Sequence, residues 1–412
     1  MGGGLLQLVA YGAQDVYLTG NPQITFFKAV YRRHTNFAIE AIQQTFNGTP
    51  GYGQRVTSTI SRNGDLIHRV YLTVDLSNSS GDELCKFFGH RLVNYVEVEI
   101  GGQKIDKQYS HWMYIWNELS LPISKRDGYY KMIGAVGGQP GTNMEKQLYI
   151  PLEFWFCRNI GLALPLISLQ YHEVKINLQF ETSAKCQGGA TALTGSFDAS
   201  LWVDYIFLDT DERRRFAQLS HEYLIEQLQF TGQESIQSKD MKSKLNFNHP
   251  CKELVWFVTD SSTNSGNNNW MNYTTVAADN TYKLASDDDV ADMISKLSGS
   301  SVSSKNPIAA AKLVLNGNDR FSQRDGLYFN LVQPFQHHEN VPVNAGINVY
   351  SFALKPEEHQ PSGTLNMSRI DTAVLNITTN YTSTDMKNLN VYAVNYNVLR
   401  IMSGMGGIAY SN

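Results

Sequence analysis

Short stretches of alternating apolar and polar residues are the most frequent pattern along this chain. In VEVEI at residues 96–100 the apolar side chains fall on one face and the carboxylates on the other, and the same period recurs at residues 71–76 and 174–180. A period of two is typical of a strand with one buried face. Many such stretches, separated by long loops, predict an all-β protein built from antiparallel sandwiches.

Turn residues divide these stretches. Asn63-Gly64-Asp65 lies between the strand-like residues 56–60 and 66–76, which predicts a hairpin. Gly101-Gly102 directly follows residues 96–100 and is expected to turn the chain there. The segment 260–280 is rich in Ser, Asn, Gly and Thr, a composition that predicts an exposed loop.

Few segments have a helical pattern. Residues 84–92 and 111–119 are each expected to form two or three turns. A third helix is predicted over residues 290–297, because Ser286 can cap it and Asp289 can complete a capping box. The aspartates at 287–289 are alternatively a cation site, but carboxylates at a helix start are stabilised by the helix dipole without a metal.

The chain carries marks of an internal duplication. Three short segments recur in the same order, roughly 185 to 215 residues apart, as expected for a duplicated domain whose loops differ in length. The pairs are residues 39–43 with 225–229, residues 100–104 with 315–319, and residues 174–178 with 374–378. A duplicated β domain favours a protein that tiles or binds over one with a single catalytic cleft.

The joint between the two copies is expected at residues 210–222. Residues 209–215 (DTDERRR) are charged, and strand-like residues 222–230 follow. Arg213, Arg214 and Arg215 could form a phosphate or partner clamp, but Asp209, Asp211 and Glu212 offset their charge. We therefore expect a solvated surface linker.

Length and charge limit the classes of function that are compatible with this chain. The 412 residues are enough for two domains of about 200 residues each. The formal net charge is -4 and the pI about 6.2, so no global positive field is available to hold nucleic acid. The four cysteines have no metal-binding or disulfide-scaffold spacing and are expected to be buried or free thiols made in a reducing compartment.

Catalytic signatures are missing from the sequence, which contains no G-x-S-x-G, P-loop or H-E-x-x-H motif. Residues 404–409 fit G-x-G-x-x-A, but no helix can follow them to face a pyrophosphate. His337-His338-Glu339 could supply metal ligands, although neighbouring histidines beside Pro334 are more often exposed. His172 is expected to be structural. We predict no enzyme activity, no cofactor and no metal site.

Six N-glycosylation sequons occur, at Asn47, Asn78, Asn272, Asn366, Asn376 and Asn380. The amino terminus lacks the pattern of a secretory signal, and a chain rich in Asn, Ser and Thr forms such triplets by chance. Asn272, inside the predicted loop 260–280, is the candidate glycan attachment site.

Several long motifs resemble one known family. They are LVAYGAQDVYLTGNPQITFFK at residues 8–28, GLALPLI at 161–167, LQYHEV at 169–174, WVDYIFLDT at 202–210, HEYLIEQL at 221–228 and LRIMSGMGG at 399–407. Together they resemble major capsid proteins of large icosahedral double-stranded DNA viruses, especially those that infect algae. The resemblance runs from one end of the chain to the other.

The resemblance implies a double jelly roll, two tandem eight-stranded antiparallel sandwiches with a few short helices in loops. It implies an amino-terminal arm at residues 1–27, a first jelly roll at 28–211 and a second at 222–412. Three chains would form a pseudo-hexagonal homotrimer that tiles the shell. The implied location is the virion capsid, after assembly in the host cytoplasm. Implied partners are neighbouring capsomers, minor capsid proteins and glycans on outer loops, with the internal viral membrane reached only indirectly and no direct contact with nucleic acid.

Trp112, Tyr114 and Trp116 are candidate trimer contacts, in loops expected near residues 106–130, because aromatic residues are enriched in interface cores. The alternative is that these rings fill the core of the first domain. The rival function is a carbohydrate-binding or glycan-processing jelly roll. That rival predicts a cleft with convergent carboxylates or repeated aromatic platforms, and neither is legible in the sequence.

Overall fold

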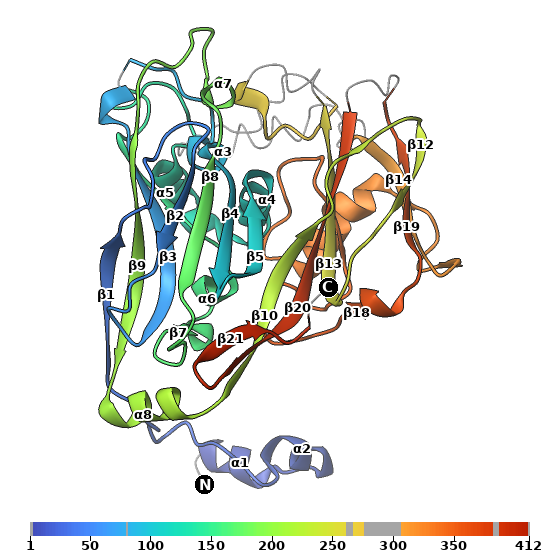
Figure 1. The fold of residues 1–412 in the computed structure, drawn as a ribbon. Coiled ribbons are helices and arrows are strands. Elements are labelled where there is room, and N and C mark those ends of the chain that lie inside the picture. Colours follow the sequence, from blue (N-terminus) through green and yellow to red (C-terminus); the bar gives the residue numbers. More distant parts are fainter. Residues whose placement is uncertain (1–2, 80, 261–266, 276–305, 382–386, 411–412) are drawn as a thin grey trace. The chain divides into compact units, whose positions relative to one another are not determined.

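The computed structural model describes residues 3–79, 81–260, 267–275, 306–381 and 387–410, and the chain forms two compact units, Met1–Asn36 and Phe37–Asn412 (Figure 1). The first unit contains α1 (Gly3–Val9), a 3-10 turn (Ala13–Asp15) and α2 (Val16–Thr19). None of these elements buries a residue. In the described ranges, no helix is long and apolar enough to cross a membrane.

The first lobe of the second unit is a sandwich of two antiparallel sheets. One sheet has the order β1-β9-β3-β6, with β7 on β3, and the other has the order β2-β8-β4-β5. The strands are β1 (Phe37–Gln44), β2 (Arg55–Thr59), β3 (Leu66–Asp75), β4 (Val93–Ile100), β5 (Gln103–Tyr109), β6 (Gln147–Pro151), β7 (Leu164–Pro165), β8 (Val174–Phe180) and β9 (Asp198–Leu208).

The second lobe repeats this arrangement. One sheet has the order β10-β20-β13-β17, with β11 and β21 on β20 and β18 on β13, and the other has the order β12-β19-β14-β15, with β16 on β14. The strands are β10 (His221–Phe230), β11 (Glu234–Ser235), β12 (Asp240–Lys244), β13 (Pro250–Asp260), β14 (Ile308–Leu315), β15 (Asn318–Asp319), β16 (Arg324–Asp325), β17 (Asn348–Ser351), β18 (Leu365–Asn366), β19 (Ala373–Thr379), β20 (Lys387–Met402) and β21 (Met405–Ile408).

The predicted duplication corresponds to this repeated strand order. Residues 39–43 and 225–229 lie in β1 and β10, the edge strands that pair with the long strands β9 and β20. Residues 100–104 and 315–319 form the β4–β5 and β14–β15 hairpins, and residues 174–178 and 374–378 lie in β8 and β19. Each pair of marks therefore occupies equivalent strands, and the predicted double jelly roll is confirmed.

One predicted hairpin is wrong. Asn63-Gly64-Asp65 does not join paired strands, because β2 pairs with β8 and β3 pairs with β6, β7 and β9 in the other sheet. The turn instead carries the chain across the sandwich. Gly64 is needed there because a Cβ at this position would lie 2.9 Å from the Cβ of Tyr205.

The helices are only partly as predicted. The helix expected at 111–119 is α4 (Ser110–Ser120), whereas that at 84–92 is reduced to α3 (Phe88–Leu92). Residues 106–130 are not loops, since α4 is followed after Pro122 by α5 (Ile123–Ile133). The helix predicted over 290–297 lies outside the described residues. Further short helices in the described residues include α6 (Trp155–Arg158), α7 (Ser183–Cys186) and α11 (Gln333–His337), which follows a π turn (Tyr328–Val332).

The expected solvated linker is a helix, α8 (Thr210–Gln218). The Asp209 side chain accepts a hydrogen bond from the Glu212 amide, 2.9 Å away, and so caps the helix start. Arg213 Nε lies 2.9 Å from Oδ1 of the buried Asp65, at the end of the turn described above. No residue of α8 is buried, so the connection between the lobes is a capped helix that is exposed to solvent, as the charged sequence predicted.

Buried apolar side chains of the two lobes merge into one cluster. Val98 and Leu178 of the first lobe belong to the same cluster as Val255 and Tyr392 of the second, and a separate cluster fills the rest of the second lobe. The cysteines are free, as predicted, and three of the four are buried. The lobes are consequently joined by a continuous core.

Candidate functional site: the junction between the two lobes

Helix α4 lies at the centre of the junction. Nine of its eleven residues are buried, the pattern of a helix surrounded by protein. The centroid of the Trp112 ring is 5.7 Å from that of Tyr392 on β20, and the Tyr114 ring is 6.0 Å from Tyr273. The Trp116 ring faces the Arg158 guanidinium at 4.0 Å. A helix of the first lobe is thus packed against strands and loops of the second.

The three rings predicted as trimer contacts are therefore inside the chain. Trp112 and Tyr114 are each 1% exposed and Trp116 is 5% exposed. Their position in the core where the two lobes meet is close to the alternative that the rings fill the core of the first domain. A role in contacts between chains stays a prediction.

His111 fixes one end of α4 to the second lobe. Its Nδ1 lies 2.8 Å from the Tyr273 hydroxyl, and its ring also contacts Phe257 and Trp270. Burial lowers the pKa of His111 to about 3, so the ring is neutral near pH 7. The contact is a neutral hydrogen bond within an aromatic cluster.

The described part of the predicted exposed loop, residues 267–275, is a docking segment instead. Asn268 accepts a hydrogen bond from the Lys86 amide at 3.1 Å and donates one to the Gly188 carbonyl at 2.8 Å. Trp270 is buried and donates its indole N–H to the Lys86 carbonyl at 2.8 Å. The prediction of exposure is wrong for residues 270–274. Asn268, one of the polar residues that suggested a loop, instead forms hydrogen bonds with backbone groups of the other lobe and so holds the segment against it.

Asn272, the candidate glycan site, lies in this segment. Its side chain is buried, and Oδ1 accepts hydrogen bonds from the Thr274 amide at 3.0 Å and hydroxyl at 2.7 Å. The sequon therefore forms a local turn in the structure of the isolated chain. Glycan attachment at Asn272 stays a prediction.

Strands β5 and β10 contact each other through polar groups. Asp106 Oδ1 accepts a hydrogen bond from the Leu228 amide at 3.0 Å, and the Gln227 side chain donates to the Ile105 carbonyl. Burial raises the pKa of Asp106, although the Leu228 amide and the nearby Arg158 oppose that rise. These bonds satisfy backbone groups that would otherwise be buried between the lobes without partners.

The glycine-rich carboxyl-terminal run closes another side of the junction. The turn between β20 and β21 places the Gly404 carbonyl 3.0 Å from the Tyr171 amide, and His172 Nδ1 lies 3.1 Å from the Gly406 amide that donates to it. A Cβ on Gly404 would lie 2.6 Å from the Tyr171 ring, and one on Gly406 would lie 2.6 Å from Leu169. The glycines allow close packing between lobes, and His172 is structural, as predicted.

A buried ion cluster spans the junction. Glu226 on β10 lies 2.8 Å from Lys252 Nζ on β13 and 3.0 Å from Arg158 on α6 of the first lobe. Burial alone would raise the pKa of Glu226, but His359, Lys252 and Arg158 outweigh burial and lower it to about 2. Glu226 is therefore ionised and neutralised by cations from both lobes.

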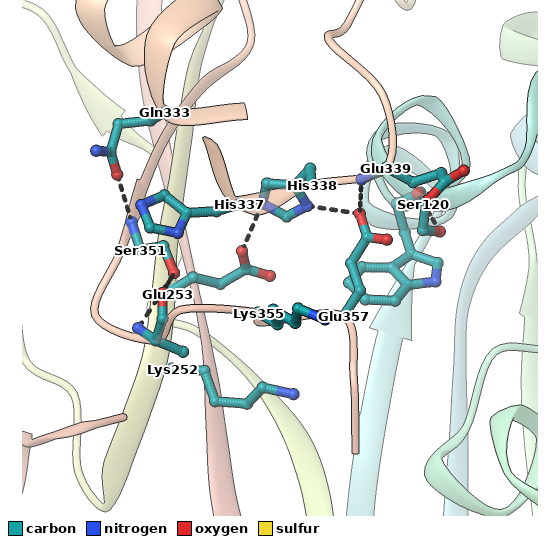
Figure 2. Close-up of polar contacts among 12 residues, drawn as sticks. Ser120, Lys252, Glu253, Gln333, His337, His338, Glu339, Ser351, Lys355 and Glu357 are labelled. Atoms are coloured by element: carbon teal, nitrogen blue, oxygen red, sulfur yellow. Dashed lines mark hydrogen bonds and ion pairs between the residues drawn. The ribbon is translucent and has the colours of Figure 1, made fainter. Parts of the chain in front are cut away.

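A second buried cluster involves the predicted His337-His338-Glu339 run (Figure 2). His338 is not exposed: its side chain and that of Glu253 on β13 are both 0% exposed. His338 Nε2 lies 2.9 Å from Glu253 Oε2, and Nδ1 lies 2.7 Å from Glu357 Oε1. In the part of the chain that the structure describes, no group of three or more His, Cys, Asp or Glu side chains could hold a metal ion.

Most residues of these two clusters were missed by reading the sequence. Lys252 and Glu253 are consecutive charges directly before the apolar run 254–258 of strand 250–260, which was a usable signal that a buried polar site interrupts this strand. Arg158 and Glu357 gave no comparable signal. Their partners are distant in sequence and adjacent only in the folded chain.

Comparison with known proteins identifies the family. A model described as large eukaryotic DNA virus major capsid protein matches residues 212–407, and a model described as major capsid protein N-terminus matches residues 25–209. The chain is 55% identical over 440 residues to the major capsid protein of Pyramimonas orientalis virus. It is 46% identical over 447 residues to that of Paramecium bursaria Chlorella virus 1, and both alignments cover 100% of each chain.

Solved structures agree with this assignment. A chain of the PBCV-1 virus capsid superposes with a TM-score of 0.79 at 42% identity, covering 94% of this chain and 100% of that chain. The Faustovirus major capsid protein reaches 0.73 at 13% identity, covering 95% and 94%, which shows the shared fold alone. The chain therefore belongs to the major capsid protein family of large eukaryotic DNA viruses and is a double jelly-roll structural protein of a viral capsid.

Proposed function

We propose that three copies of this chain assemble into a pseudo-hexagonal homotrimer, the capsomer that tiles an icosahedral shell. The observation that carries the proposal is the equivalence of the two strand orders, because it gives each chain two similar lobes. Three chains around a threefold axis then present six similar lobes, which is the condition for packing in a hexagonal array. The continuous core between the lobes supports the idea, since it joins them into one building block.

Exposed apolar side chains suggest where chains meet. On the first lobe, Phe37 and Ile39 on β1 and Tyr149 on β6 are exposed on one sheet. On the second lobe, Phe335 on α11 and Leu354 are exposed, and the bond from His337 Nδ1 to the Leu354 carbonyl at 3.0 Å connects α11 with the segment of Leu354. We propose that the first surface of one chain contacts the second surface of the next, a head-to-tail contact that closes after three subunits.

The rings of Trp112, Tyr114 and Trp116 have too little exposed surface to contribute much direct contact to a second chain. We propose that they act on the trimer by holding the two lobes in a fixed relation. A fixed relation matters because both proposed surfaces, one on each lobe, must meet neighbours at once.

Light scattering coupled to size exclusion tests the trimer. The purified chain should have a mass of about three times 46.3 kDa, and Phe335→Asp and Leu354→Asp should shift it to the monomer. Leu219→Asp is the matched control, because Leu219 at the end of α8 is 62% exposed, compared with 79% for Phe335, and lies outside both surfaces. A wild-type monomer at micromolar concentration would contradict the proposal.

The other roles follow from the family and are part of the same proposal. Residues 1–27 act as an assembly arm, and residues 28–211 and 222–412 act as the two lobes. Partners are neighbouring capsomers, minor capsid proteins and glycans at outer positions, with Asn272 as the candidate site. The chain is assembled in the host cytoplasm, contacts the internal membrane only indirectly, makes no direct contact with nucleic acid and catalyses no reaction. The net charge of -4 supports the exclusion of nucleic acid.

A further inference from the structure

His338 lies two residues before a contact between the lobes. The Asn340 amide donates to the Leu119 carbonyl at 2.9 Å, and the Asn340 side chain donates to the Leu121 carbonyl at 2.6 Å. Both carbonyls lie at the carboxyl-terminal end of α4, where the helix has no partners of its own to offer them. Residues 338–340 of the second lobe therefore cap the central helix of the first.

The position of residues 338–340 is fixed by His338. Its ring contacts Glu253, which belongs to the central strand β13, and Glu357, whose Oε1 also accepts the Glu339 amide at 3.2 Å. Figure 2 shows the imidazole between the two carboxylates. The contact with Glu253 is close but poorly aligned for a hydrogen bond, so attraction between charges is its main component.

The geometry selects one protonation state of the ring. Each ring nitrogen faces a carboxylate oxygen, and only the imidazolium has a proton on both nitrogens. Loss of the proton would leave a lone pair facing a carboxylate oxygen, an unfavourable contact for a side chain removed from solvent.

We propose that Glu253, His338 and Glu357 form a proton-dependent clasp that holds residues 338–340 of the second lobe on the end of helix α4 of the first. The clasp is a property of the single chain and goes beyond the proposed trimer. It opens when His338 loses its proton, because the carboxylates then lack the charge that draws the segment into place.

Other charged groups around the clasp have partners of their own or lie toward solvent. Lys252 contacts Glu226, Lys355 lies 2.9 Å from Glu358, and Glu118 on α4 accepts the Tyr130 hydroxyl. Other charged or titratable side chains on the elements that pack here are Arg158, His337, Glu339, His359 and Cys251, whose buried thiol donates to the Glu253 carbonyl at 3.1 Å. The two carboxylates in direct contact therefore dominate the field at the ring.

The direction of the pH dependence follows. Burial alone would lower the pKa of His338, but Glu253 and Glu357 outweigh burial and raise it from 6.5 to about 9. A raised pKa in the folded chain means that the stabilisation is complete below about pH 6.5 and is lost as the pH rises through about 9. The clasp is closed near neutral pH and opens under alkaline conditions.

The test combines hydrogen exchange and thermal unfolding of the purified full chain from pH 6.5 to 10. In wild type, exchange corrected for its intrinsic pH dependence should rise together in residues 338–340 and 119–121 as the pH approaches 9. His338→Gln should show the faster exchange already at pH 7, with a melting temperature about 3–6 °C lower and no further loss around pH 9. Glu358→Gln, which removes an exposed carboxylate next to Glu357 that pairs with Lys355 at 2.9 Å, is the matched control and should behave as wild type.

A second variant keeps the test decisive if His338→Gln does not fold. Glu357→Gln retains the shape of the side chain and removes one carboxylate, so the midpoint of opening should move to lower pH by about one unit. Profiles of wild type and Glu357→Gln with the same midpoint would overturn the proposal. Exchange that rises in residues 338–340 while residues 119–121 stay protected would also overturn it, because release of the segment would then not uncap the end of α4.

Discussion

Helix α4 and the amino-terminal unit have similar apolar content but opposite burial. α4 (SHWMYIWNELS) buries nine residues between the lobes, whereas α1 (GGLLQLV) buries none. Large apolar side chains of the first unit, among them Leu8, Tyr17 and Phe27, are exposed. Apolar composition therefore predicts that a segment is suited to contact other protein, but it does not identify the partner. The partner depends on which other segments the fold brings near.

The largest expected loss of stability is for a substitution in the buried helix α4. Trp112→Ala should lower the free energy of unfolding by about 3–5 kcal/mol, because it removes a large buried ring between α4 and Tyr392. Denaturant unfolding of the variant measures the loss, with Tyr17→Ala in the amino-terminal unit as the exposed control. If Trp112→Ala and Trp116→Ala instead dissociate the trimer and leave the stability of the chain unchanged, the rings contact a neighbouring chain.

A somewhat smaller effect is expected at the ion cluster. Arg158→Ala should cost about 3 kcal/mol, because it leaves the buried Glu226 with fewer cations. Lys355→Ala removes the exposed pair with Glu358 and should leave the unfolding midpoint close to that of wild type, because solvent screens a surface pair. Equal losses in the two variants would show that the junction pair contributes no more than a surface pair.

Glu226 also predicts an acid dependence. Its pKa is lowered from 4.5 to about 2, so its stabilisation is present above about pH 4.5 and is lost as the pH falls through about 2. Unfolding midpoints of wild type measured from pH 5 to 2 should therefore fall more steeply than those of Glu226→Gln. A variant with the same slope as wild type would assign the acid sensitivity to other carboxylates.

Asn272→Ala should have a smaller effect, about 1 kcal/mol, because it removes the bonds to the Thr274 amide and hydroxyl. Mass spectrometry of the protein from virions tests the glycan separately. A glycopeptide containing Asn272 would show that the segment is modified before it docks, whereas an unmodified peptide would leave only the structural role of Asn272.

Deletion of residues 1–27 should have the smallest effect on the chain, less than about 0.5 kcal/mol, because the helices in that region bury no residues. The same deletion should reduce the formation of ordered arrays, measured by electron microscopy at high protein concentration. A large loss of stability in the deletion variant would show that the amino-terminal unit, like α4, contributes to the stability of the chain.

Local patterns were sufficient for the strands and for the duplication. The alternation in residues 96–100 and 174–180 predicted β4 and β8, and the repeated segments identified equivalent strands in both lobes. The hairpin at residues 63–65 failed because a turn signal specifies a reversal of the chain but not the sheet that the next strand joins. The charged residues 209–215 became a helix because Asp209 caps it and Arg213 finds Asp65, a partner far away in sequence.

Local sequence patterns predicted the β strands and the duplication, and the resemblance to a known family implied the double jelly roll. The sequence left open whether the rings of residues 112–116 contact another chain or fill the core. The folded structure shows that these rings are buried where the two lobes meet, that residues 270–274 are buried and that His338 is enclosed by two carboxylates. The two kinds of property depend on interactions of different range along the sequence. Periodicity and turns are set by neighbours along the chain, whereas burial, pKa and ion pairing depend on groups that meet only after the two lobes have packed together.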